Sequence, residues 1–181
     1  MKTAFLGASL AAIVGSVATA DVIYSFTNQT WTGFFFDEAY TAGGLSGTLT
    51  GATVNATLNA SANYTYADDL TVYVAGNPLA FGGPLQCGGY SDLNALQRYS
   101  WANGGFNTPG TPVTGTVNFT TGIDMTASPT LSVWIGNGYG GAGTSGTWTG
   151  SITLLGVTAV PAPGAIALVG LAGLVGRRRR S

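Results

Sequence analysis

Apolar and polar residues alternate with a period of two along most of the chain between residues 21 and 160. The clearest example is the run at 52–60, which reads ATVNATLNA. Because successive side chains of a strand point to opposite faces, this run predicts a strand with one buried and one solvated face. Similar alternation predicts further strands at 22–26, 70–74, 113–119, 131–135 and 148–154. Residues 31–36 form another apolar run, which Gly33 partly interrupts.

Residues 82–102 are a longer stretch in which this alternation is lost. The stretch is rich in glycine, and Ser91 or Asp92 is placed to cap a short helical turn over 92–98. A loop of this length inside a compact domain is often a binding segment.

About eight strands, few helical patterns and no βαβ spacing predict an all-β fold. The expected architecture is an antiparallel β-sandwich of the jelly-roll type, with two sheets packed face to face. Residues 68–74 (DDLTVYV) and 146–154 (GTWTGSITL) resemble the Asp-Leu strand and the closing Gly-x-Trp strand of P-domain-like jelly rolls. This resemblance implies the jelly-roll variant of the sandwich.

The first twenty residues have the layout of a secretory signal peptide. Lys2 supplies a basic start, residues 4–17 are apolar, and Ala18 and Ala20 form a small-x-small cleavage site before Asp21. We expect a signal helix over 1–20 that is removed by signal peptidase. The alternative, an N-terminal membrane anchor, is disfavoured by the short apolar run and the clean cleavage site.

The other end of the chain, residues 159–181, combines a proline motif, an apolar segment and a basic cluster. The motif is Pro161-Ala162-Pro163, and residues 164–176 carry no charge. The cluster consists of Arg177, Arg178, Arg179 and Arg180. A helix over the apolar segment would be about 20 Å long, short of the roughly 30 Å hydrocarbon core, so we predict a short and marginal transmembrane helix. Arginines that follow such a helix stay cytoplasmic, which places the preceding domain outside the membrane.

The order and position of these three pieces closely resemble the PEP-CTERM sorting signal of bacterial envelope proteins. In this chain Ala162 stands where that family usually has glutamate. The resemblance implies export, a membrane-anchored precursor, and cleavage near the triplet by an exosortase-like membrane protease. It further implies delivery to the cell surface or to an exopolysaccharide matrix. A tail retained as a permanent anchor is the alternative.

The resulting segments are a signal peptide at 1–20, an extracellular β-sandwich domain at 21–158 and a sorting and anchor segment at 159–181. Charged residues make up only 7% of the chain, so Thr, Ser and Asn must solvate the surface. Between the two end segments Arg98 is the only basic residue beside seven acids, which gives a net charge of −6. Because nucleic-acid binding needs Lys and Arg to displace counterions, this composition argues against a nucleic-acid partner.

The sequence predicts no catalytic residue, and we expect the protein not to be an enzyme. It contains no histidine, which removes the commonest general base and the commonest transition-metal ligand. Cys87 is the only cysteine, so it has no intramolecular disulfide partner, and we expect it to be buried. Asp37 and Glu38 are neighbours that a strand directs to opposite faces, unlike the facing carboxylates of a glycosidase.

Two binding hypotheses remain. Asp68 and Asp69 precede a predicted strand and offer the oxygen ligands that calcium prefers, with Asp92 or Asp124 as additional ligands. The alternative is that they are turn residues, because the sequence has no Asp-x-Asp-x-Asp-Gly loop. No other metal and no other cofactor is predicted.

Aromatic side chains beside the Thr and Asn ladders are the second hypothesis, because aromatic planes stack on sugar rings and amides bond to hydroxyls. These aromatics, which alternatively fill the core, are Tyr64, Tyr66, Tyr73, Trp101 and Trp134. The expected function is an exported structural protein of the cell surface or extracellular matrix. The alternative is a secreted carbohydrate-binding or calcium-dependent adhesion module.

Overall fold

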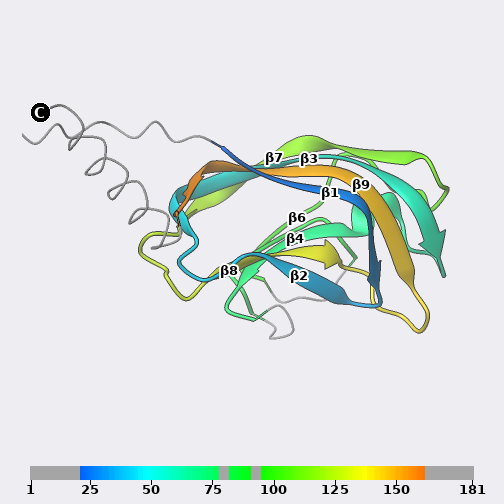
Figure 1. Cartoon of the computed structure of the whole chain (residues 1–181), viewed down its shortest axis with the longest axis horizontal. Helices are drawn as coiled ribbons and strands as arrows, with labels where there is room; N and C mark the ends of the chain where they lie inside the picture. The colour runs from blue at the N-terminus through cyan, green and yellow to red at the C-terminus, as the bar shows by residue number, and fades with distance from the viewer. Residues whose placement is uncertain (1–20, 78–81, 91–94, 162–181) are drawn as a thin grey trace, which may run out of the picture.

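The computed structural model describes residues 21–77, 82–90 and 95–161, which form two β-sheets packed face to face (Figure 1). The four-stranded sheet has the order β1 (Val22–Thr32), β9 (Ser145–Ala159), β3 (Leu45–Ala62), β7 (Thr111–Asp124). The five-stranded sheet has the order β2 (Phe35–Tyr40), β8 (Ser132–Asn137), β4 (Leu70–Ala75), β5 (Leu85–Cys87), β6 (Gln97–Tyr99). A single 3₁₀ turn, η1 (Ala67–Asp69), precedes β4 within this part of the chain. The predicted all-β sandwich is confirmed.

The predicted helices at 1–20 and 164–176 lie outside the described residues. Within the ranges that the structure does describe, no helix is long and apolar enough to cross a membrane.

The period-two pattern of residues 52–60 produces the long strand β3 as expected. Val54, Ala56 and Leu58 are buried between the sheets, whereas Asn55 and Asn59 are exposed on the opposite face. Strand β3 pairs with β9 on one side and with β7 on the other, both antiparallel. The apolar face of the central strand is therefore covered by the other sheet, and its polar face forms the outer surface of the sandwich.

Two tryptophans lie in the core between the sheets. Trp31 at the end of β1 and Trp148 near the start of β9 are 1% and 0% exposed, and their ring centroids are 5.7 Å apart. The indole N–H of Trp148 donates to the carbonyl of Ala67 at 3.1 Å, so this buried polar group has a partner. The core thus reaches directly to η1, which carries two aspartates.

The outer face of the four-stranded sheet is lined by hydroxyl and amide side chains. Thr30 and Thr147 hydrogen-bond across β1 and β9 at 2.7 Å, and Thr53 and Thr116 do so across β3 and β7 at 2.8 Å. Two complete rows across the four strands contain no charged residue: Ile23, Thr153, Thr53, Thr116 and Ser25, Ser151, Asn55, Thr114. This arrangement explains how a domain with so few charges can still present a polar surface.

The apolar run at 31–36 is divided at Gly33 (φ 66°), where the chain turns and passes from β1 in one sheet to β2 in the other. The structure corrects two expectations. The short strands β5 and β6 pair in parallel, so the second sheet is mixed rather than purely antiparallel. Within the predicted turn over 92–98, residues 97–98 belong to β6, where strand pairing overrides the local helical signal. Residues 91–94 lie outside the described ranges.

The buried tryptophan pair yields a stability prediction. Trp148→Ala should lower the free energy of unfolding by about 3–5 kcal/mol, because it removes a large core side chain and leaves a cavity. Urea denaturation of the purified chain measures this loss. Phe35→Ala is the control, because Phe35 is 54% exposed, and it should change stability by less than about 1 kcal/mol. Equal losses in the two variants would contradict the assignment of the core.

Candidate functional site

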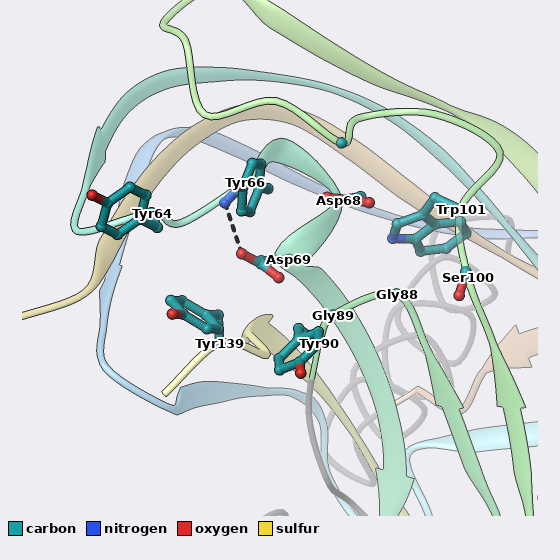
Figure 2. A pocket seen from close by; sticks show the side chains of 11 residues that line it. Tyr64, Tyr66, Asp68, Asp69, Gly88, Gly89, Tyr90, Ser100, Trp101 and Tyr139 are labelled. Carbon is teal, nitrogen blue, oxygen red and sulfur yellow. Dashed lines mark hydrogen bonds between the residues drawn. The ribbon is translucent and has the colours of Figure 1, made fainter. Parts of the chain in front are cut away.

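A pocket of about 600 Å³ opens at one end of the sandwich, beside η1 (Figure 2). It is formed by the segment that joins β3 to β4, the loops that follow β5 and β6, and the connection from β8 to β9. Its lining residues are Tyr64, Tyr66, Asp68, Asp69, Gly88, Gly89, Tyr90, Ser100, Trp101, Gly105 and Tyr139. Aromatic rings and two carboxyl groups therefore share one cavity.

The backbone of residues 67–70 is the framework of this pocket. Each of its four carbonyl groups accepts a hydrogen bond from a different segment of the chain. In chain order the donors are Trp148 Nε1 at 3.1 Å, Gly89 N at 2.7 Å, Gly138 N at 2.8 Å and Trp101 Nε1 at 2.7 Å. The position of the two aspartates is thus determined by contacts with β9 and with the loops after β5, β6 and β8.

Asp69 is the more enclosed of the two acids, with 3% of its surface exposed. Its Oδ2 atom accepts the backbone N–H of Tyr66 at 2.7 Å, the hydrogen bond drawn in Figure 2. Burial away from water raises the pKa of Asp69 to about 6, and the neighbouring Asp68 also raises it. The N–H groups of Tyr66 and Tyr90 oppose this rise without cancelling it.

Asp68 is only half-buried, and burial also raises the pKa of its carboxyl group. In Figure 2 Asp68 lies between Tyr66 and Trp101. Gly105 lies beside the Asp68 carboxyl group: a Cβ atom added to Gly105 would be 4.0 Å from Asp68 Oδ2. Asp68 is therefore the carboxyl group that a ligand entering the pocket would meet.

Tyr64 stands on a strained turn. Asn63 and Tyr64 have φ angles of 48° and 66°, which are unusual for any residue with a side chain and costly for a bulky one. Thr65 N–H donates to Ala62 O at 3.4 Å, and the Thr65 hydroxyl donates to the same carbonyl at 3.1 Å. Two hydrogen bonds therefore stabilise the turn. The turn leaves the Tyr64 ring 70% exposed at the pocket.

The remaining aromatic walls come from loops rich in glycine. Tyr90 and Tyr139 meet edge to face with ring centroids 6.0 Å apart, and Tyr90 is 77% exposed. Trp101 is held rigidly, since its indole N–H is bonded to the carbonyl of Leu70. Gly88 (φ 80°) allows this approach, because a Cβ at that position would collide with both Trp101 Nε1 and the Leu70 carbonyl.

The structure separates the aromatic residues that the sequence indicated. Tyr64, Tyr66 and Trp101 line the pocket, whereas Tyr73 is fully buried and Trp134 packs beside it on the outer side of the five-stranded sheet. The Thr and Asn ladders lie on the outer face of the other sheet. The ladders and the aromatic residues therefore do not form one face.

Tyr90 and Tyr139 are pocket residues that the sequence analysis missed. Tyr90 falls in the irregular stretch at 82–102 and Tyr139 in the glycine-rich connection after β8. The available signal in both places was a tyrosine that directly follows glycine in an irregular stretch. Only the folded chain shows that the two loops meet.

The predicted calcium ligands are only partly brought together. Asp68 and Asp69 line the pocket, but Asp124 lies at the end of β7, where its side chain accepts the Ala127 N–H at 2.9 Å. Asp92 lies outside the described residues. In the described ranges no group of three or more His, Cys, Asp or Glu side chains gathers. A calcium site at the two aspartates stays a prediction.

The other reactive side chains lie away from the pocket. Asp37 accepts the Trp31 indole N–H at 2.8 Å, while Glu38 accepts the Ser132 hydroxyl at 2.6 Å on the opposite face of β2. The expected divergence of these two acids is confirmed. Cys87 is buried in the core as predicted, and burial raises the pKa of its thiol. An ionised thiol nucleophile is therefore disfavoured at that position.

Of the predicted processing residues, Pro161 is described and exposed at the end of the domain. The others, Ala18, Ala20, Ala162, Pro163 and Arg177 to Arg180, lie outside the described residues.

No family model, curated protein or solved structure matches this chain. The fold and the site define its class, a β-sandwich protein with an aromatic and acidic pocket.

The buried Asp69 carboxyl predicts a pH-dependent stability. Its pKa is about 6 in the folded protein, against 3.8 when it is not perturbed. Between these values the folded state binds more protons than the unfolded state, so this group makes the protein less stable as the pH rises from about 4 to about 7. Asp69→Asn, which keeps an acceptor for Tyr66, should remove that decline. Thermal unfolding across this pH range measures the effect.

Asp124→Asn is the matched control, because it neutralises an exposed acid outside the pocket. This variant should keep the difference in melting temperature that the wild type shows between about pH 4 and about pH 7. Parallel curves for the wild type and Asp69→Asn would contradict the assigned pKa.

Proposed function

We propose that this protein is exported, anchored in the membrane as a precursor and then delivered to the cell surface or extracellular matrix. The layout of both ends supports this route: a signal-peptidase site at Ala18 and Ala20, and the Pro161-Ala162-Pro163 triplet before an apolar segment and four arginines. The processing partners are signal peptidase and an exosortase-like membrane protease. A structural role in the matrix requires that the exported domain bind a component of the matrix.

In this proposal the sandwich domain binds carbohydrate, and its ligand is the exopolysaccharide of the matrix. The observation that supports this function is the pocket, in which four tyrosines and Trp101 surround Asp68 and Asp69. Aromatic faces stack on the apolar faces of sugar rings, and carboxylate oxygens accept hydrogen bonds from sugar hydroxyls. A volume of about 600 Å³ falls within the usual range for small-ligand sites.

We also propose that the sandwich is a jelly roll. The strand order β1-β9-β3-β7 facing β2-β8-β4-β5 supports it, because the sheets exchange strands as in two Greek keys, with β6 as an addition at the edge. Lectin domains are among the proteins built on jelly rolls. This likeness is one of architecture alone, so the pocket rather than the fold supports the ligand class.

A non-enzymatic role fits the same site. The two pocket acids are consecutive residues on one short turn, whereas glycoside hydrolysis uses two carboxyl groups on opposite sides of the bond to be cleaved. Asp37 and Glu38 are engaged elsewhere. The pocket is therefore suited to retaining a sugar rather than to cleaving it.

A calcium-dependent adhesion module is the second candidate. It is favoured by the fact that two of the predicted calcium ligands, Asp68 and Asp69, line the pocket. A calcium requirement for carbohydrate binding would distinguish this candidate from direct binding.

The export route predicts a defined processed species. Intact mass and terminal peptides of protein recovered from membrane and matrix fractions should reveal a chain that starts at Asp21 and ends near Pro161 to Pro163. Retention of Arg177 to Arg180 in the membrane fraction, with no shorter form elsewhere, would instead identify the tail as a permanent anchor.

Tyr64 offers a test that separates binding from folding. Glycine adopts positive φ readily, so Tyr64→Gly should leave the melting temperature unchanged or slightly raised. The same change removes an aromatic platform and should weaken binding of purified exopolysaccharide by about tenfold or more, at a cost of about 1.4 kcal/mol. Affinity electrophoresis and calorimetry, each with and without added calcium, measure the binding.

Ile23→Ala is the matched control, because it truncates a side chain that is 61% exposed on the outer face of the four-stranded sheet. It should bind like the wild type. If Tyr64→Gly also binds like the wild type, the pocket is not the carbohydrate site.

A further inference from the structure

The charge of the pocket has one sign. Its titratable lining groups are Asp68, Asp69 and the tyrosines Tyr64, Tyr66, Tyr90 and Tyr139, and none of the described lining residues is basic. A ligand with carboxylate or sulfate groups would therefore meet two carboxyl groups without a compensating cation. A ligand with a positive charge would find both a counter-charge and aromatic faces.

The two carboxyl groups have different roles in this arrangement. Asp69 is nearly enclosed, and its carboxylate accepts a hydrogen bond from the Tyr66 backbone N–H. It therefore adds negative charge to the pocket but has little surface for a direct contact with a ligand. Asp68 is half-buried beside Gly105 and lies between Tyr66 and Trp101 in Figure 2. A cation at Asp68 would share the pocket with Tyr66 and Trp101, and cation–π attraction adds to ion pairing where a cation lies over a ring face.

The oxygen atoms around the pocket favour an organic cation over calcium. Calcium takes about six to eight oxygen ligands, usually including backbone carbonyls. Among the described residues only two carboxyl groups line the pocket, and each of the adjoining carbonyls of residues 67–70 already uses one of its two lone pairs in a hydrogen bond. An ammonium group needs only a few acceptors, and the rings around it supply the rest of its environment.

We propose that the pocket selects amino sugars, with a protonated sugar amine held at Asp68 between the aromatic walls. This inference rests on the proposed carbohydrate function and narrows it to polysaccharides that carry free amino groups. Uronic-acid polymers are disfavoured by the same charges. N-acetylated sugars keep the ring for stacking but lose the positive charge, so they should bind more weakly.

Three tetrasaccharides test this selection by calorimetry with the full chain at about pH 6.5. They are a glucosamine oligomer, its N-acetylated counterpart and a galacturonate oligomer. The glucosamine oligomer should bind about tenfold more tightly than the acetylated one, a difference of about 1.4 kcal/mol. Added salt should reduce that difference, because an ion pair at a half-exposed carboxyl group is screened.

Asp68→Asn keeps the shape of the side chain and removes its charge. It should bring the affinities for the aminated and acetylated oligomers to within about threefold, and Asp124→Asn should leave the wild-type ratio intact. Equal binding of both oligomers to the wild type, or binding only after calcium is added, would overturn the amino-sugar selection and leave the carbohydrate function standing. If no oligomer and no exopolysaccharide binds, the carbohydrate function itself fails.

Discussion

Four consecutive carbonyl groups, those of residues 67–70, hold the functional end of this sandwich together. Their donors lie on β9 in one sheet and after β8, β5 and β6 in the other. Because two of the donors are buried indole N–H groups, the turn η1 is joined directly to the aromatic core. Loss of either indole bond would leave a buried N–H group without a partner, which costs more than the bond contributes. The pocket inherits its rigidity from this arrangement.

Unfavourable local features are concentrated around the same turn. A carboxyl group is buried at Asp69 and its pKa is raised, while Tyr64 is held at a positive φ angle. Such features persist only where the surrounding structure enforces them, and they are enriched at binding sites. Here the surrounding structure is the sandwich, whose long strands and buried tryptophan pair supply stability away from the pocket.

The distribution of charge follows the same division. Apart from Ile23, the central outer rows of the four-stranded sheet carry hydroxyl and amide groups and no charge, whereas two of the seven acids meet in the pocket. A surface of uncharged threonine hydroxyl groups has no strong long-range electrostatic interactions. The two carboxyl groups of the pocket thus lie together with aromatic side chains.

The sequence by itself determined the sandwich, because period-two alternation in runs such as 52–60 requires one buried and one solvated face. It also identified Asp68, Asp69, Tyr64, Tyr66 and Trp101 as candidates, since acids and aromatics beside strands are visible without a fold. Local patterns do not encode which loops meet. Only the tertiary structure brought Tyr90 and Tyr139 to those acids and buried Tyr73 on the outer side of the five-stranded sheet. It also divided the run at 31–36 between two sheets and paired β5 with β6 in parallel. Those outcomes depend on contacts between residues far apart in the chain, and such contacts leave no periodic trace in the sequence.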